Sequence, residues 1–127
     1  SQTPKKILII EDNESYLSIL NQKLSIEKYD VATAQNGPEG IQKITDNQPD
    51  IILIDLLLPK MNGIEVMEKI RQSNTGKTLP FVILTNLNPD DEILQRIMKN
   101  KPAYYLVKPK VTLDDIAEKI KNVLQIS

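Results

Sequence analysis

The chain has 127 residues, which is close to the commonest size of one domain and too short for two ordinary ones. Its 16 basic and 17 acidic residues give a net charge of −1, which argues against a domain whose main task is to hold nucleic acid. The absence of Cys and His excludes disulfides, thiolate chemistry, Ser–His nucleophiles and most zinc sites. No apolar run approaches the roughly 20 residues that cross a bilayer, and the N-terminus lacks the pattern of a signal peptide.

Five short segments have the composition of β-strands. In chain order they are Lys6–Ile10, Tyr29–Ala34, Ile51–Asp55, Phe81–Thr85 and Tyr104–Lys108. The first, third and fourth are nearly continuous apolar runs rich in β-branched residues, which predicts strands buried on both faces, as in a parallel sheet. In the second segment apolar and polar residues alternate, and Asp and Thr are among them, so we expect this strand at an edge of the sheet.

Helical patterns separate and follow these strands. Apolar side chains recur at helical spacing in three stretches: Leu17, Leu20 and Leu24; Ile93, Leu94, Ile97 and Met98; and Leu113, Ile116, Ala117, Ile120, Val123 and Leu124. Four expected helix starts pair a capping residue with an acid three positions later: Asn36 with Glu39, Asn62 with Glu65, Asn88 with Asp91, and Thr112 with Asp115. The alternation of strand and helix predicts right-handed βαβ units and a parallel sheet covered on both faces.

Polar residues stand at the carboxyl ends of four expected strands. Glu11 and Asp12 follow the first strand, while Asp55, Thr85 and Lys108 end the third, fourth and fifth. Ligands of open parallel sheets bind outside these carboxyl ends. We therefore expect the five side chains to meet at one edge of the sheet.

This set of side chains suits the transfer of phosphate to a carboxylate. Three carboxylates close together repel one another unless a cation is present. Oxygen ligands without His or Cys favour Mg²⁺ over Zn²⁺. One carboxylate can act as a nucleophile and form an aspartyl phosphate, while an ammonium group and a hydroxyl stabilise the charge on the transferred oxygens.

Each residue taken singly also has an ordinary explanation. Glu11 and Asp12 could be acids in the first turn of a helix, and Asp55 could cap a turn. Thr85 is of a type common in strands, and Lys108 could be a solvated charge. The functional interpretation depends on the conjunction of all five in this order at four strand ends.

With these motifs the sequence resembles the receiver domains of two-component response regulators over essentially its whole length. The matching pieces are Glu11–Asp12, the stretch Asp55–Gly63 (DLLLPKMNG), Thr85, and Tyr105–Pro109 (YLVKP). The resemblance implies a flavodoxin-like (βα)5 fold with a doubly wound, five-stranded parallel sheet in the order 2-1-3-4-5. It also implies that residues 1–127 form a single domain.

The resemblance assigns a role to each residue of the set. Asp55 would be the phosphoacceptor. Mg²⁺ would bind directly to Asp12 and Asp55, through water to Glu11, and to the backbone carbonyl of Leu57.

Further roles concern the phosphoryl group and the switch. Thr85 and Lys108 would bind the phosphoryl oxygens, and Tyr105 would swing inward when Thr85 moves. The bond between Lys108 and Pro109 would be cis.

The implied function is that of a phosphorylation-activated switch in a phosphorelay. A sensor histidine kinase or a phosphotransfer protein would supply the phosphate. A downstream effector or a second receiver copy would recognise the face formed by the fourth helix, fifth strand and fifth helix. The chain would catalyse only its own phosphorylation and dephosphorylation, in the cytoplasm, without direct contact with nucleic acid or membrane.

Three positions depart from the family pattern. Glu11 stands where Asp is frequent, and Asn86 is bulkier than the usual Ala or Gly, which would narrow access to Asp55. Lys101–Pro102 replaces a common Gly-Ala before the fifth strand. None of these changes removes a required group.

Three other functions remain as alternatives. A pseudo-receiver would use the fold for binding without phosphorylation, but the acids and Lys108 are all present. A phosphatase of the haloacid dehalogenase type would need a second acid two residues after Asp55, where Leu57 stands. A nucleotide-binding loop could be suggested by Gly76, Lys77 and Thr78, but a Walker loop needs Gly at the position of Arg71.

Overall fold

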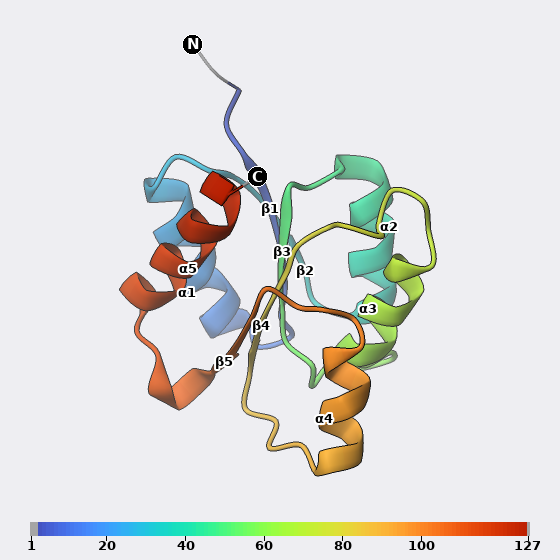
Figure 1. The fold of residues 1–127 in the computed structure, drawn as a ribbon. Helices are drawn as coiled ribbons and strands as arrows, with labels where there is room; N and C mark the ends of the chain where they lie inside the picture. The colour runs from blue at the N-terminus through green and yellow to red at the C-terminus, as the bar shows by residue number, and fades with distance from the viewer. Residues whose placement is uncertain (1–2, 127) are drawn as a thin grey trace.

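The computed structural model describes residues 3–126, which form a five-stranded sheet with helices on both faces (Figure 1). In chain order the elements are β1 (Lys6–Ile10), α1 (Glu14–Ile26), β2 (Asp30–Ala34), α2 (Gly37–Asn47), β3 (Ile51–Ile54), α3 (Gly63–Arg71), β4 (Phe81–Thr85), α4 (Asp91–Met98), β5 (Tyr104–Val107), a 3-10 turn (Lys108–Lys110) and α5 (Leu113–Ile126). Within this described part, no helix is long and apolar enough to span a bilayer.

The strands lie in the order β2-β1-β3-β4-β5, and every neighbouring pair is parallel. The expected flavodoxin-like order is therefore confirmed, with β2 at an edge as its alternating sequence indicated. Three predicted strand ends shift by one residue: β2 begins at Asp30, β3 ends at Ile54 and β5 ends at Val107. Asp55 and Lys108 are thus the first residues after their strands.

Two apolar cores fill the two sides of the sheet. Side chains of β1 alternate between them: Ile7 and Ile9 pack with α1 and α5, whereas Leu8 and Ile10 pack with α2, α3 and α4. All the side chains of β3 and β4 are buried. The continuous apolar runs that predicted these central strands are explained by this burial on both faces.

Three of the four predicted helix caps are present. The Asn36 side chain accepts a hydrogen bond from the Glu39 N–H, and reciprocal caps join Asn62 with Glu65 and Thr112 with Asp115. The prediction for α4 is wrong.

The start of α4 lies two residues later than predicted, because Asp90 rather than Asn88 accepts a hydrogen bond from the Ile93 N–H. The apolar side chains of α4 also do not all face the core, although their helical spacing had suggested that they would. Only Ile97 is buried, whereas Ile93, Leu94 and Met98 are exposed. The helix has eight residues and presents most of its apolar side chains to solvent.

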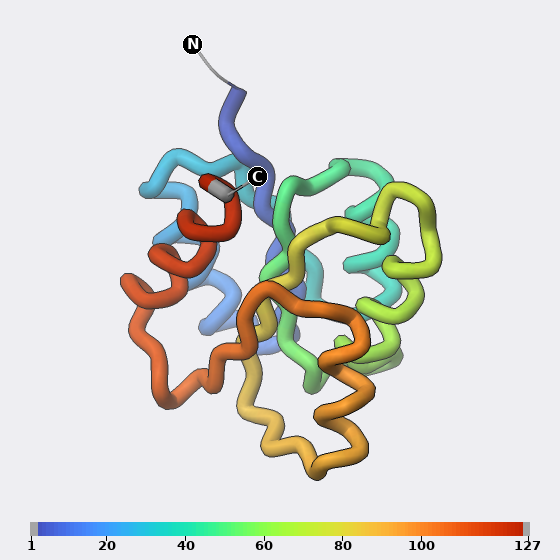
Figure 2. Tube along the Cα trace, in the orientation of Figure 1, coloured from blue at the N-terminus to red at the C-terminus, as the bar shows by residue number. Residues whose placement is uncertain are grey.

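The carboxyl ends of the strands share one end of the molecule. The loops after β1, β3 and β4 lie there, at the bottom of the view, whereas β1 begins and α5 ends at the opposite end (Figure 2). Gly63 brings α3 close to the loop after β3, where its N–H donates to the Leu56 carbonyl at 2.9 Å. A Cβ at position 63 would lie 2.4 Å from the Asp55 carbonyl oxygen, so this close approach requires glycine.

Candidate functional site

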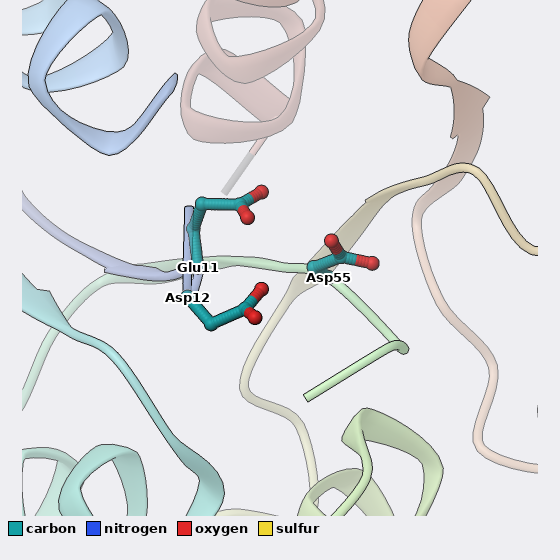
Figure 3. Close-up of side chains that lie close together, drawn as sticks. All are labelled: Glu11, Asp12 and Asp55. Carbon is teal, nitrogen blue, oxygen red and sulfur yellow. The ribbon is translucent and has the colours of Figure 1, made fainter. Parts of the chain in front are cut away.

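Four strand ends bring five polar side chains to one edge of the sheet. Glu11 and Asp12 follow β1, Asp55 follows β3, Thr85 ends β4 and Lys108 follows β5. One carboxylate oxygen from each of the three acids lies within 4.8 Å of the others (Figure 3). The predicted meeting of these side chains is confirmed.

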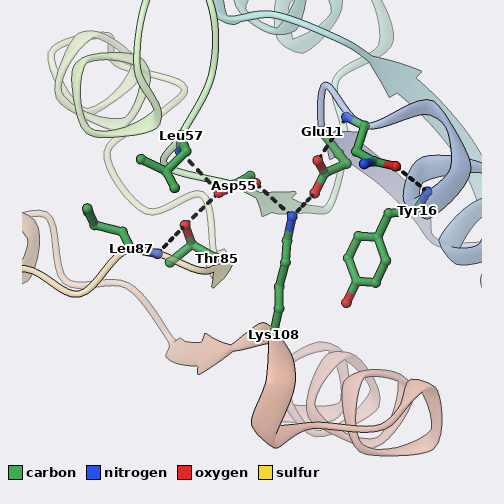
Figure 4. A network of polar contacts seen from close by, with 8 residues as sticks. Glu11, Tyr16, Asp55, Leu57, Thr85, Leu87 and Lys108 are labelled. Atoms are coloured by element: carbon green, nitrogen blue, oxygen red, sulfur yellow. Dashed lines mark hydrogen bonds and ion pairs between the residues drawn. The ribbon is translucent and has the colours of Figure 1, made fainter.

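The Lys108 ammonium group lies between two of the acids (Figure 4). Its Nζ is 2.7 Å from Oε1 of Glu11 and 2.8 Å from Oδ2 of Asp55. The two carboxylates are 3% and 5% exposed, so solvent screens these ion pairs much less than pairs on the surface. Lys108 Nζ also lies 4.7 Å from the centre of the Tyr16 ring, within the range of a cation–π interaction.

The second oxygen of Asp55 has different partners. Oδ1 accepts a hydrogen bond of 2.5 Å from the Thr85 hydroxyl and one of 3.0 Å from the Leu57 N–H. The Thr85 oxygen in turn accepts from the Leu87 N–H at 3.2 Å. The Asp55 carboxylate is therefore held by a cation on one oxygen and by two neutral donors on the other.

The three carboxylates of the site carry more negative charge than the single Lys108 ammonium group can balance. Burial raises the pKa of the Glu11 carboxyl above its usual value, and the Lys108 hydrogen bond only partly opposes this effect. Burial lowers the pKa of the Lys108 ammonium, but its hydrogen bonds to Asp55 and Glu11 outweigh burial, and the net pKa is raised. The two shifts have different causes: burial dominates for the Glu11 carboxyl, whereas the two carboxylate partners dominate for the Lys108 ammonium.

The remaining ligand atoms suit a hard cation. Both oxygens of Glu11 are occupied, since Oε1 binds Lys108 and Oε2 accepts from the Asn13 N–H at 3.0 Å. The Asp12 side chain is exposed, and its carboxylate has no hydrogen bond or ion pair with any other residue in the range 3–126. An all-oxygen set of this kind fits Mg²⁺ better than Zn²⁺.

Two leucines flank the acceptor position that the sequence predicted. Leu57, two residues after Asp55, has a side chain that is 49% exposed. Leu87, two residues after Thr85, is half-buried and packs against the core beneath α2, α3 and α4. Its carbonyl accepts a hydrogen bond of 3.0 Å from the Tyr105 hydroxyl, which ties β5 to the loop after β4.

The departures from the family pattern lie in different places. Asn86 is exposed beside Thr85, whereas Lys101–Pro102 lies between α4 and β5, at the opposite end of the sheet from the acids. The expectation of a cis bond between Lys108 and Pro109 is wrong, because every peptide bond among the described residues is trans.

Sequence reasoning missed two residues that shape the site. Asn13 caps α1 by accepting from the Tyr16 N–H at 2.9 Å, and its own N–H holds Glu11. The capping pattern used elsewhere required an acid three positions later, and here that position is Tyr16. No sequence signal indicated that the Tyr16 ring would lie against Lys108.

Comparison with known proteins gives a family for this arrangement. Residues 7–121 match the sequence profile of the response regulator receiver domain. The chain belongs to this family. Receiver domains are signalling switches of two-component systems rather than conventional enzymes, and response regulators interact with histidine kinases or phosphotransfer proteins. Receiver domains also generally bind Mg²⁺ at an acidic pocket.

Curated relatives of this receiver are longer proteins. The alkaline phosphatase synthesis transcriptional regulatory protein PhoP of Bacillus subtilis is 41% identical over 88 residues, which are 69% of this chain and 35% of that protein. The response regulator PleD of Caulobacter vibrioides is 32% identical over 111 residues, which are 87% of this chain and 24% of that protein. This receiver thus spans well under two thirds of either relative.

Solved structures of receivers superpose along nearly the whole chain. A CheY-like receiver domain protein of Methanospirillum hungatei has a TM-score of 0.88 at 30% identity, covering 97% of this chain and 95% of that one. The chemotaxis response regulator CheY4 of Vibrio cholerae has a TM-score of 0.86 at 26% identity, covering 95% and 99%.

Removal of the shared ammonium group should destabilise this receiver. In metal-free buffer we expect Lys108→Met to lower the free energy of unfolding by about 1–3 kcal/mol, because Glu11 and Asp55 then lose their cation while remaining buried. Lys110→Met, at an exposed lysine in the same turn, serves as the control and should change stability by less than about 0.5 kcal/mol. Urea unfolding measures both values, and equal losses in the two variants would contradict the assignment of the ion pairs.

Proposed function

We propose that Asp55 accepts a phosphoryl group from a sensor histidine kinase or phosphotransfer protein, and that the modified chain acts as a signalling switch. The observation that supports this proposal most directly is the setting of the Asp55 carboxylate. It is nearly buried, and Lys108 and Thr85 bind its two different oxygens. A carboxylate between an ammonium group and a hydroxyl has donors in place for the oxygens of an incoming phosphoryl group.

The proposed reaction moves phosphorus from nitrogen to oxygen. An oxygen of Asp55 forms the new P–O bond as the P–N bond of a phosphohistidine donor breaks, and the freed imidazole nitrogen takes up a proton. Lys108 and Thr85 redirect their hydrogen bonds from the carboxylate to the transferred oxygens. This stabilises charge that develops during the transfer.

We further propose that the reaction depends on Mg²⁺. Asp12 and Asp55 would bind the ion directly, Glu11 would act through water, and the Leu57 carbonyl would complete the protein's share. The occupation of both Glu11 oxygens by Lys108 and Asn13 supports an indirect role for this residue. Mg²⁺ would supply neutralisation of charge on the acids and on the phosphoryl oxygens.

The proposed switch links Asp55 to the far side of β4. Phosphorylation adds close to two negative charges at the sheet edge. Thr85 would turn toward the phosphoryl group, and Tyr105 would move inward after its hydroxyl leaves the Leu87 carbonyl. The exposed apolar side chains of α4, namely Ile93, Leu94 and Met98, support a partner-binding face formed by α4, β5 and α5.

The lifetime of the phosphoryl group would depend on the two leucines. Loss of phosphate to water requires an attack in line with the P–O bond, and polar side chains two residues after the acceptor and after the Thr can orient that water. Leu57 and Leu87 cannot form hydrogen bonds through their side chains, and Asn86 adds bulk nearby. We propose a long-lived phosphoryl state suited to slow regulation.

Other parts of the proposal concern the whole chain. Residues 1–127 would act as one receiver domain in the cytoplasm, through protein partners rather than nucleic acid or membrane. A pseudo-receiver that never carries phosphate is the second candidate, and the exposed, bulky Asn86 beside Thr85 is the observation that favours it.

The acceptor can be tested by mass. Incubation with acetyl phosphate and Mg²⁺ should add one phosphate to the wild type, because Asp55 is the only proposed nucleophile, and none to Asp55→Asn. EDTA should abolish the labelling. Intact-mass spectrometry measures both, and equal labelling of Asp55→Asn or of the EDTA sample would refute the acceptor and its metal dependence.

The switch can be followed by NMR with beryllofluoride, which mimics the phosphoryl group. We expect amide shifts in the loops around Asp12 and Asp55 and also across residues 93–121, since the Thr85 movement would reach Tyr105. In Thr85→Ala the loop shifts should persist while those across 93–121 shrink. Wild-type shifts confined to the loops would contradict the proposed relay.

The lifetime can be tested by giving the two positions polar side chains. After removal of the donor, the double variant Leu57→Asn, Leu87→Glu should lose phosphate about tenfold faster than the wild type, which corresponds to about 1.4 kcal/mol of barrier. Leu57→Asn alone is the control for folding, because Leu57 is exposed whereas Leu87 packs on the core. If the wild type loses its phosphate as fast as the folded variants do, the leucines do not control the attack of water on the phosphoryl group.

A further inference from the structure

A cleft of about 810 Å³ lies at the end of the sheet opposite the acids. It is bounded by the end of α3, the loop before β4, the turn between α4 and β5, and the last turns of α5. Four basic side chains line it, namely Arg71, Lys77, Lys99 and Lys101, and no acid is among its lining residues. We name this feature the basic cleft.

Arg71 is held in the basic cleft without a carboxylate. Its Nε donates to the Asn100 carbonyl at 2.9 Å, and its Nη1 donates to the carbonyls of Gly76 and Leu79 at 2.7 and 2.6 Å. Its guanidinium also lies 4.9 Å from the Phe81 ring centre. The three anchored N–H groups leave the two donors of Nη2, which have no hydrogen-bonding partner among the described residues.

The positive charge of the basic cleft is locally uncompensated. Burial lowers the pKa of Arg71, and no carboxylate offsets that effect. Lys99 lies close enough to Glu68 to help lower the pKa of that carboxyl, but both oxygens of Glu68 are held by Arg96 at 2.6 and 2.7 Å. In a chain whose net charge is −1, this concentration of cations is a local property.

The rest of the basic cleft is apolar. Pro80, Ala103, Val123 and the half-buried Tyr104 contribute to its lining. A further cation contacts the Tyr104 ring, since Lys119 Nζ lies 5.1 Å from the ring centre. The volume falls within the range of roughly 300–1,000 Å³ that is typical of small-molecule sites.

We propose that the basic cleft binds a small organic phosphate ester, with the phosphates on the cations and the organic group on the apolar lining beside Tyr104. A phosphate ester carries between one and two negative charges at neutral pH, and lysine and arginine are its usual ligands. A nucleotide has both parts of this chemistry, whereas inorganic phosphate lacks the apolar one.

The basic cleft is independent of the phosphoacceptor. Its residues lie at the amino ends of β4 and β5, whereas Asp55 and Lys108 lie beyond the carboxyl ends of β3 and β5. Lys77 and Thr78, whose sequence suggested a nucleotide-binding loop, line the basic cleft, but the loop leads into a strand rather than into the helix that a Walker loop requires.

The test uses the full chain in EDTA, so that the acids hold no metal, with ATP, adenosine and pyrophosphate as probes. ATP should produce saturable amide shifts in residues 71–79 and 99–104, while the amides of Glu11, Asp55 and Thr85 stay in place. The double variant Lys77→Glu, Lys99→Glu should weaken ATP binding by about tenfold. Adenosine and pyrophosphate should each bind more weakly than ATP.

The matched control is Lys5→Glu, Lys69→Glu, which makes the same change in net charge at two exposed lysines outside the basic cleft. It should bind ATP within about twofold of the wild type. Absence of saturable shifts up to about 10 mM ATP, equal weakening in both double variants, or shifts confined to the acidic edge would overturn the proposal. Pyrophosphate binding as tight as ATP would overturn the role of the apolar lining.

Discussion

Two nearly buried carboxylates, those of Glu11 and Asp55, share the single ammonium group of Lys108, and the parallel sheet brings these three side chains to one edge. β1 and β3 are parallel neighbours, so the acids that follow them emerge side by side. The cation comes from beyond β4, directly after the edge strand β5, and its long side chain reaches both acids. One positive charge cannot balance the three carboxylates, which leaves the deficit that a divalent cation would fill.

The central strands could be predicted because burial on both faces leaves a strong sequence signal. The apolar runs in β1, β3 and β4 have no polar face to obscure them, and their order with the helices restricts the connections to a few. The site followed from the same reasoning, since polar residues directly after buried strands must lie at the carboxyl edge. Thr85 and Lys108 therefore came together with the acids as predicted, although each residue type is common elsewhere.

The features that the sequence did not predict correctly depend on how each helix or side chain packs against the rest of the fold. The apolar spacing of α4 was detected, but spacing does not tell whether a stripe meets the core, and only Ile97 reaches it. Asp90 rather than Asn88 caps the helix, and the sequence alone did not decide between these two polar residues on either side of Pro89. The contact of Tyr16 with Lys108, and the three carbonyls around Arg71, join segments whose proximity exists only after the chain has folded.

The start of β1 and the end of α5 determine where a label or a fused protein can be attached. β1 begins and α5 ends at the side of the molecule remote from Asp55. A dye, a solid support or a fused protein attached before β1 or after α5 would therefore start from the side of the molecule away from the acids. The last turns of α5 place Val123 in the wall of the basic cleft, so an attachment after α5 would start closer to that cleft than to Lys108.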